Sequence, residues 1–437
     1  MKQAVLVTVG VILAVPAITQ DLPPGILLLS RVKAHMRDEL QRLATISCVE
    51  TVEREHQPPK GKLQPLDTIR LEVLTNGEKE LFASPGDRKF SENHPMSYAG
   101  SGTLGNGLFG PYLKDIFVSE IVASEYRSEY REEEQEGGRH LARYEYNIPL
   151  LFSAQTIHTM EGSGTVSLHG SYWVDPRNYD VVRLELNAGD FPPTLPVTEM
   201  KTIITYARTV LSERLEVLLP ETADLRLVKA SGEVSHNRIG FTHCRIFAAE
   251  STIDFNAPDA SVQPPRFGAA TVDETLRPLP AGLPIAVKLS SQISADVAVG
   301  ALIEGVVERN VTARRDVVVP AGSRVRGRIR RLERYAEPFP YFVVGIEFME
   351  VEVQGIRHLF YADLASIDPA PGLERFLTTR NTTEQLNDPF GSVSSRQQQE
   401  RLTLYDLPGV ATFFLKGSRL DLPRGFRTEW KTRPLNP

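Results

Sequence analysis

The chain has 437 residues, with 49 Lys and Arg against 55 Asp and Glu, so its formal net charge at pH 7 is -6 and its pI is near 5.9. A chain of this length can form two or three domains, each with a sizeable core. The weakly acidic balance excludes a whole-molecule field that attracts polyanions, so any anion site must be local.

The first residues, MKQAVLVTVGVILAVPAITQ, have the layout of a secretory signal peptide. Lys2 is followed by an apolar run from Ala4 to Val15 and by the small-residue exit Val15, Pro16 and Ala17, which predicts cleavage after residue 17. The alternative is a short membrane anchor, but the run has about half of the roughly 20 residues that a spanning helix needs. We expect an exported protein, in the periplasm if the source is a diderm bacterium, with no transmembrane segment after cleavage.

The two cysteines of the chain are Cys48 and Cys244, and each lies in a stretch with strand-like alternation. Two thiols in an oxidising compartment favour one disulfide, and closing a loop of this length constrains the unfolded chain by roughly 5 kcal/mol in the chain-entropy model. Two separately buried free thiols are the alternative.

The predicted first domain, residues 18–256, begins with one helix and continues as antiparallel strands. Apolar residues recur every three or four positions from Leu27 to Thr45, which predicts an amphipathic helix. From Ile46 onward the period is two, as in TIRLEVL and LARYEYNIPL, and this predicts half-buried strands. Asp175 and Pro176 in GSYWVDPRNYDVVRLEL indicate a hairpin turn.

The predicted second domain, residues 276–437, follows a Pro- and Ala-rich linker over residues 257–275. Pro-X-Gly turns precede strand-like stretches from Leu279, Val319 and Leu422, and they favour a small β-barrel. Residues 366–400 are polar and predict a flexible excursion. The expected fold is mainly β: a helix with a curved antiparallel half-barrel, then a small barrel.

The order of one helix and a strand meander that includes GSYWVDPRNYDVVRLEL resembles the periplasmic lipoprotein-carrier and lipoprotein-sorting families. The resemblance covers roughly Leu27 to Phe255. It implies a curved sheet around an apolar groove that binds acyl chains, with the helix as a lid. The lid and groove candidates on this basis are Leu29, Val32, Met36, Leu40, Leu43, Tyr144, Tyr146 and Trp173.

The segment from Leu279 to Ile329 resembles the periplasmic β-barrel domain of scaffold proteins of type IV secretion and conjugation channels. The matching positions are Pro280, Gly282, Ile293, Ser294, Gly300, Pro320, Gly322, Ser323 and Gly327. The chain has no counterpart of the family's membrane-spanning helix or channel-forming segment. The resemblance therefore implies the barrel without the secretion function, because a fold alone does not fix a function.

The sequence lacks the surrounding elements or the spacing that catalytic, metal-binding and nucleotide-binding motifs require. GSGTLG, residues 100–105, lies in a Gly-rich stretch without the flanking strand and helix of a dinucleotide site. His236, His243 and Cys244 lack metal-ligand spacing, and no G-x-S-x-G is present. We therefore expect no cofactor, no metal and no enzyme.

Four arginines, Arg324, Arg326, Arg328 and Arg330, recur at every second position of SRVRGRIRR. On one face of a strand they are spaced by roughly 6.6 Å. The row lacks interleaved aromatic residues, which argues against nucleic acid. Anionic lipid groups or acidic residues of a partner domain are alternatives, and so is a solvent-facing edge whose charge prevents strand addition.

The sequence thus predicts an exported, non-catalytic cell-envelope protein that binds an acyl chain or a lipoprotein in its first domain. The alternative is a structural or assembly component of an envelope complex that acts through its barrel. An enzyme that acts on an envelope polymer is a third hypothesis.

Overall fold

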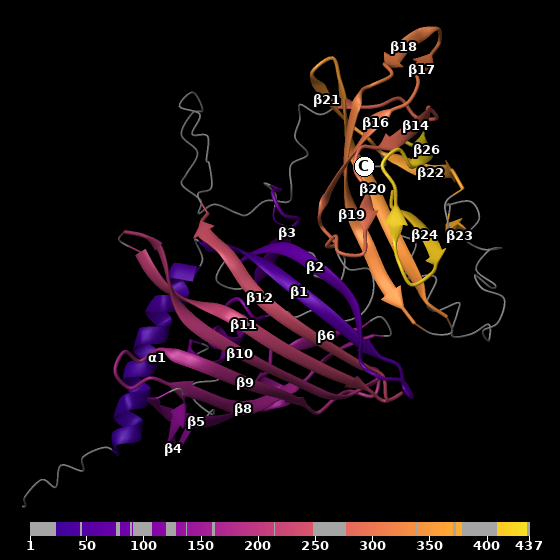
Figure 1. Cartoon of the computed structure of the whole chain (residues 1–437). Helices are drawn as coiled ribbons and strands as arrows, with labels where there is room; N and C mark the ends of the chain where they lie inside the picture. Colours follow the sequence, from indigo (N-terminus) through magenta and orange to yellow (C-terminus); the bar gives the residue numbers. More distant parts are fainter. Residues whose placement is uncertain are drawn as a thin grey trace, which may run out of the picture.

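In a computed structural model of the chain, two large sheets follow one another along the sequence (Figure 1). The structure describes residues 23–43, 46–75, 79–87, 90, 107–118, 128–136, 138–159, 162–213, 215–247, 277–336, 339–369, 373–377 and 409–434. The predicted signal peptide, the linker and GSGTLG lie outside these residues, as does most of the predicted excursion.

The first sheet has 10 strands and is antiparallel throughout, as predicted. In spatial order its strands are β3 (Glu80–Ala83), β2 (Gln64–Thr75), β1 (Ile46–Gln57), β12 (Val234–Ile246), β11 (Leu215–Lys229), β10 (Val197–Ser212), β9 (Val181–Gly189), β8 (Ser167–Val174), β5 (Arg139–Ile148) and β4 (Glu129–Glu136). The hairpin predicted around Asp175 is confirmed as β8 and β9.

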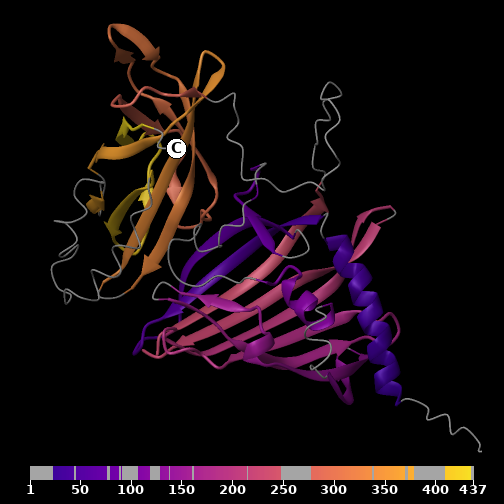
Figure 2. The same ribbon diagram turned by 180° about the vertical axis from the view of Figure 1, so that it is seen from behind.

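Two helices lie against this sheet. The predicted long helix is confirmed as α1 (Pro24–Leu43), which begins three residues earlier than expected, because proline is well tolerated in the first helical turn. The second helix, α3 (Pro111–Phe117), contacts α1. Figure 2 shows both helices on one side of the curled strands. A short 3-10 turn, η1, covers Leu150–Phe152.

The second large sheet also has 10 strands and is strongly curved, as expected for a small barrel domain. The strands along its main path are β13 (Arg277–Pro278), β21 (Ile356–Leu359), β20 (Tyr341–Val353), β19 (Arg324–Tyr335), β16 (Leu302–Val307), β14 (Pro284–Leu289), β26 (Arg427–Thr432) and β22 (Ala362–Ile367). Off this path, β24 (Ala411–Lys416) pairs with β20 and with β23 (Leu373–Leu377). Residues 373–377 are therefore a strand, not part of a flexible excursion, because β24 supplies a hydrogen-bonding partner.

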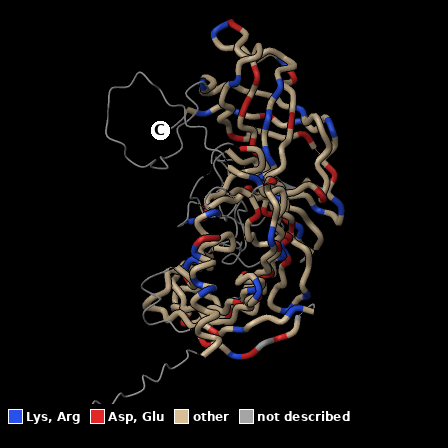
Figure 3. The backbone as a smooth tube through the Cα atoms, turned by 90° about the vertical axis from the view of Figure 1, so that its left-hand side faces the viewer, with Lys and Arg blue, Asp and Glu red and all other residues tan. Residues whose placement is uncertain are grey.

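Three two-stranded pairs complete the described elements. They are β6 (Thr156–His158) with β7 (Ser163–Thr165), β15 (Ile293–Ser294) with β25 (Asp421–Leu422), and β17 (Val311–Ala313) with β18 (Asp316–Val319). Acidic and basic residues are interspersed along both large sheets (Figure 3).

The apolar core runs without interruption from one sheet into the other. Val52, Ile69 and Ile239, on the inner face of the first sheet, belong to the same buried cluster as Val299 and Ile329 of the second domain. On the outer face of the same strands, Glu53, Arg70 and Arg238 are exposed. This alternation gives the first sheet one apolar, concave face, and α1 and α3 lie on it.

Candidate functional site

The inner face beneath α1

The helix α1 turns one apolar stripe toward the first sheet. Val32, Met36 and Leu43 are almost fully buried, and Leu29 and Leu40 pack partly buried against the same core. All five predicted lid residues therefore lie on the side of α1 that faces the core. Ala34 and Arg37 are exposed on the opposite side.

Tyrosines from neighbouring strands stack under the first turn of α1. The ring of Tyr144 on β5 stacks on Tyr172 on β8, with ring centroids 5.3 Å apart, and its hydroxyl donates a hydrogen bond to the Gly25 carbonyl at 2.7 Å. The ring centroid of Tyr146 lies 6.2 Å from that of Tyr172, and the ring of Phe117 on α3 meets Tyr172 edge-on, with centroids 5.1 Å apart. Tyr144 and Tyr146 thus lie on the inner face, as the sequence predicts.

The placement of Trp173 differs from the prediction. Successive side chains of a strand point to opposite faces, so Trp173 lies on the outer face while its neighbour Tyr172 lies on the inner one. There its ring packs under the guanidinium groups of Arg183 and Arg143, at 4.5 and 5.6 Å, and its indole N–H donates to Glu134 at 2.8 Å. Trp173 therefore does not line the groove.

A polar network, which we call the latch, joins α1 to the sheet. It consists of His35 and Glu39 on α1, Asp180 before β9, and Arg208 on β10. The Arg208 guanidinium donates to Asp180 at 2.5 and 2.9 Å and to Glu39 at 3.1 Å.

The remaining contacts of the latch close it around two buried carboxylates. His35 Nε2 lies 2.8 Å from Asp180, and the other Glu39 oxygen accepts the backbone N–H of Leu218 at 3.1 Å. Glu39 and Asp180 are 3% and 2% exposed. Their burial makes Arg208 the main counter-charge at this contact, and its pKa is raised by the hydrogen bonds to Asp180.

The acidic cluster on the inner face

Two carboxylates are buried on the inner face, next to the start of α3. Glu80 on β3 accepts the backbone N–H groups of Gly107 at 2.6 Å and Phe109 at 2.5 Å. The ring of Phe109 packs 6.0 Å from that of Phe241, which is the residue paired with Glu50 of β1. Glu50 and Glu80 therefore approach the same region of the interior from different strands.

Burial dominates the electrostatics of this region. It raises the pKa of Glu80 to about 7, and the two backbone hydrogen bonds only partly offset the rise. Burial, together with the charge of Glu80, raises the pKa of Glu50 well above its ordinary value. The same two causes raise the pKa of Tyr112 on α3 and of Tyr206 on β10.

The charge of Glu80 acts on Tyr206 because the sheet is curved. Strands β2, β1, β12 and β11 separate β3 from β10 in the sheet order. Only a strongly curled sheet brings side chains from these two strands into one electrostatic cluster. We name Glu50, Glu80, Tyr112 and Tyr206 the acidic cluster.

The arginine row and the domain junction

The arginine row faces carboxylates of the same chain. Arg328 is 3% exposed, donates to the Gly300 carbonyl at 2.8 Å and pairs with Asp87 of the first domain at 2.6 Å. Arg330 pairs with Glu347 at 3.0 Å and Arg326 with Glu304 at 3.8 Å, whereas Arg324 is exposed. One of the partners suggested by the sequence, an acidic residue of another domain, is thus present at Arg328.

The two domains also share backbone hydrogen bonds. Val299 N donates to the Thr68 carbonyl at 2.9 Å, and Arg70 N donates to the Val299 carbonyl at 3.0 Å, so this segment pairs with the edge of β2. Gly300 follows with φ of +93°, and a Cβ there would meet the Arg70 carbonyl oxygen at 2.5 Å. A glycine is therefore required at this point of contact.

A buried ion pair lies at the same junction. Arg54 of β1 and Asp67 of β2 make two hydrogen bonds, at 2.7 and 2.6 Å, with both side chains 1% exposed. Glu333 and Arg331 of β19 are fully buried and act electrostatically on this pair. Since Arg54 and Asp67 lie on the inner face, the second domain covers this end of the first sheet.

The disulfide, metals and known structures

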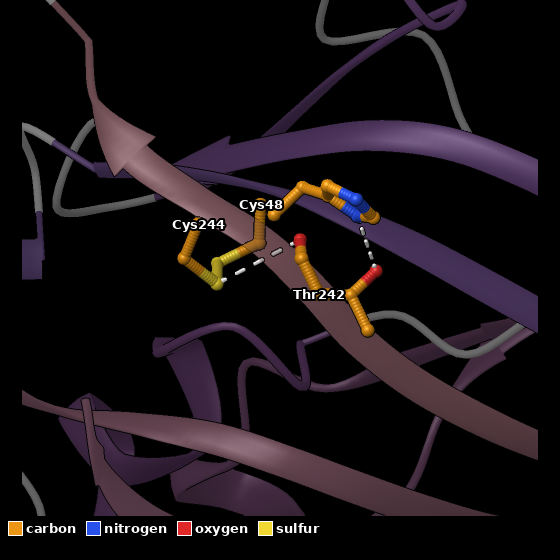
Figure 4. The surroundings of a disulfide bond; sticks show 4 residues. Cys48, Thr242 and Cys244 are labelled. Atoms are coloured by element: carbon orange, nitrogen blue, oxygen red, sulfur yellow. Dashed lines mark hydrogen bonds between the residues drawn. A yellow bond between two sulfur atoms is a disulfide. The ribbon is translucent and has the colours of Figure 1, made fainter. Parts of the chain in front are cut away.

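The predicted disulfide is confirmed between Cys48 and Cys244 on the neighbouring strands β1 and β12 (Figure 4). It sits at an irregularity of the strand pairing, where the register changes between Ser47 and Val49. His243, the residue before Cys244, has φ of +50°, consistent with a β-bulge. The bridge links β1, which follows α1, to β12, which is the last strand of the first sheet in chain order.

Among the described residues, no group of three or more His, Cys, Asp or Glu side chains is arranged to hold a metal ion. Within the same part of the chain, no helix is both long and apolar enough to cross a membrane.

No protein-family model and no curated protein sequence matches the chain, but solved structures do. An outer membrane lipoprotein-sorting protein domain from Vibrio parahaemolyticus is 14% identical, covering 52% of this chain and 96% of its own, with a TM-score of 0.27. A LolA superfamily protein from Nitrosomonas europaea is 12% identical, with coverages of 49% and 94% and a TM-score of 0.25. ComB10 of the Com type IV secretion system of Helicobacter pylori is 13% identical, with coverages of 36% and 88% and a TM-score of 0.19.

Both resemblances predicted from the sequence are therefore matched by solved structures of the same kinds. At TM-scores this low the likeness supplies no argument about a site.

The sequence did not predict the latch or the acidic cluster. One signal for the cluster was available, because Glu50 alternates with Ile46, Cys48 and Val52 in ISCVETV and so falls in an apolar row. Asp180 and Arg208 gave no such signal, since their partners are on α1, more than 140 residues away.

Proposed function

We propose that the chain is an exported, non-catalytic cell-envelope protein that holds an apolar chain, such as the acyl chain of a lipid or lipoprotein, on the inner face of its first sheet beneath α1. The observation that carries the proposal is the way in which α1 is attached. The helix covers an apolar face, yet its deepest contacts with the sheet include the charged latch of Glu39, Asp180 and Arg208. Water can replace a polar contact and an acyl chain can replace an apolar one, so such a helix is suited to moving aside.

The junction supports α1 as the moving part. The end of the inner face at Arg54 and Asp67 is covered by the second domain, which is joined to β2 by the backbone hydrogen bonds of Val299 and to Asp87 by Arg328. Opening that end would break these contacts and expose the apolar residues buried between the two sheets, which is costly. The end beneath α1 has tyrosines and aliphatic side chains under a single helix, and this favours entry there.

The disulfide supports the compartment. A structural disulfide between Cys48 and Cys244 persists in oxidising surroundings such as the periplasm and is rare in the cytosol. An envelope location also suits an acyl-chain ligand, since lipids and lipoproteins are abundant there.

A new charge on the buried face of α1 tests the proposal. We expect Met36→Glu to abolish binding of a fluorescent acyl-chain probe, because a carboxylate would be buried where the apolar chain lies. Ala34→Glu places the same charge on the exposed side of α1 and should bind the probe like the parent protein. Equal binding by the two folded variants would contradict a site beneath α1.

A second candidate function is an assembly contact through the second domain, and a specific surface favours it. Leu302 and Val306 on β16 are 64% and 37% exposed, and they pair in register with Arg328 and Arg324 of β19. Exposed aliphatic residues next to arginine are typical of protein interfaces. If this face mediates assembly, light scattering should detect a multimer that Leu302→Lys converts to a monomer.

A further inference from the structure

The acidic cluster holds polar groups that the described fold leaves without partners. The hydroxyl of Tyr206 is buried and has no hydrogen-bond partner among the described residues, although the side chain is only 6% exposed. Glu50 is 3% exposed, and no described residue donates a hydrogen bond to its carboxylate. A buried polar group without a partner is costly, so the Tyr206 hydroxyl requires an explanation, and the buried carboxylate of Glu50 belongs to the same cluster.

The cluster lies on the apolar face that the proposed function assigns to the ligand. Glu50 is on the same face of β1 as Val52, and Phe241, opposite Glu50, packs against Phe109. Glu80 is already oriented, since two backbone N–H groups hold its carboxylate in place. Each carboxylate oxygen accepts more than one hydrogen bond, so Glu80 keeps acceptor capacity for a ligand.

We propose that Glu50, Glu80 and Tyr206 bind the polar end of the carried molecule, and that this end is a primary ammonium group. This inference rests on the proposed function, because it names the class of amphiphile that the inner face takes. The cluster offers two carboxylates and one hydroxyl, all of which can accept hydrogen bonds. An ammonium group has three donors and no acceptor, and its positive charge can compensate the negative charge of a buried carboxylate.

Other polar ends fit less well. A carboxylate or phosphate would place a negative charge beside two buried acids and would be repelled by whichever of them is ionised. A hydroxyl group donates one hydrogen bond and carries no charge, so it would leave at least one acid uncompensated. The preference for one polar end over another arises mainly because a poorly matched end leaves buried groups of the cluster without hydrogen bonds.

The test compares three amphiphiles that differ only in their polar end. Calorimetric titration of the full mature chain at pH 7 would use dodecylammonium, dodecanol and dodecanoate, each below the concentration at which it aggregates or separates from solution. We expect dodecylammonium to bind about tenfold more tightly than either of the others, or better, as a charge-assisted pair implies. Glu50→Gln and Tyr206→Phe should each weaken dodecylammonium binding and leave dodecanol binding unchanged.

A matched control lies on the same strand. Glu53 of β1 is 62% exposed on the outer face, so Glu53→Gln removes an equal charge without touching the cluster and should not alter binding. If all three amphiphiles bind equally, or if neither cluster variant changes the preference, the ammonium inference is wrong while the carrier function stands. If none of the three binds, the proposed function itself is wrong.

Discussion

At the residue scale, His236 illustrates how the outer face of the first sheet can sense pH. Its Nδ1 lies 2.8 Å from Glu55 of β1 and its Nε2 lies 2.8 Å from Asp224 of β11. Burial of the ring opposes protonation, but the hydrogen bonds to Glu55 and Asp224 outweigh it, and the pKa is raised. The folded chain therefore binds this proton more tightly than the unfolded chain does.

The raised pKa of His236 has a defined effect on stability. The stabilisation is fully present below the unfolded-state pKa of about 6.5 and is lost as the pH rises through the folded-state pKa. We expect His236→Gln to lower the free energy of unfolding by about 1 kcal/mol at pH 5 and by much less at pH 9, the partial exposure of Asp224 limiting the effect. Urea unfolding at both pH values checks this, with His169→Gln, an exposed site on β8, as control. A loss that does not depend on pH would contradict the assignment.

Residue-scale reasoning from the sequence succeeded where local alternation decides and failed where it does not. Tyr144 and Tyr146 alternate with Arg143 and Glu145, so their shared face was readable. Trp173 stands between Tyr172 and Val174, and three apolar residues in a row do not reveal which one points inward. The structure places Trp173 with Arg143 and Arg183, on the outer face.

At the element scale, the attachment of α1 to the first sheet depends on Arg208 of the latch. Arg208 is 25% exposed and serves two carboxylates that are almost fully buried. Removing it leaves Asp180 with His35, at 2.8 Å, and Glu39 with the exposed Arg42, at 3.3 Å, as their basic partners on α1. We expect Arg208→Gln to lower the free energy of opening α1 by about 2 kcal/mol, less than for a fully buried pair because Arg208 is partly exposed.

Hydrogen exchange measures that opening directly. In Arg208→Gln the amides of residues 24–43 should exchange faster, by roughly the tenfold or more that such a change implies, while those of β1 and β2 keep their protection. Arg226→Gln removes a 44% exposed arginine from the neighbouring strand β11 and should leave α1 unchanged. Exchange that rises equally over α1 and β1 would show that Arg208 stabilises the whole domain and does not hold the helix.

The helix itself and the β8–β9 hairpin were predictable because their signals are local. Apolar spacing fixed α1 to within a few residues at each described end, and the Asp-Pro turn fixed the hairpin. The latch was not predictable, because it depends on which strand the helix crosses. That choice is made by the curvature of the sheet, which no short stretch of sequence encodes.

At the scale of the whole molecule, the junction joins the two domains into one unit through β2 and β19. Gly300 is its most sensitive point, since a Cβ there would meet the Arg70 carbonyl oxygen of the first domain at 2.5 Å. We expect Gly300→Ala to weaken docking, so that calorimetry resolves two unfolding transitions and small-angle scattering shows a larger radius of gyration. The backbone strain alone is of order 1–3 kcal/mol.

A variant at a second glycine separates the effect of the contact with the Arg70 carbonyl from the effect of backbone strain. Gly322 has φ of +83°, similar to the +93° of Gly300, but a Cβ at that position would meet nothing within 4 Å. Gly322→Ala should therefore destabilise the second domain without separating the two transitions. Identical behaviour of the two variants would mean that the junction does not couple the domains.

The β character of the two large sheets followed from the sequence, but the contact between the sheets did not. The arginine row suggested an acidic partner, and alternation could not tell which member would be buried. Arg328 is buried because Asp87 and the Gly300 carbonyl meet it at the junction. Contacts between domains join residues hundreds of positions apart, and one sequence gives no measure of them.

The central claim is that the first domain carries an apolar chain beneath α1. Native mass spectrometry of the mature protein, purified from the periplasm of a diderm bacterium, tests it most directly when bound lipid is extracted and identified. We predict a stoichiometric added mass from an acyl-containing molecule, present in Ala34→Glu and absent from folded Met36→Glu. A bare monomer mass in the parent protein would contradict the claim, and a bare multimer would instead favour the assembly function of the second domain.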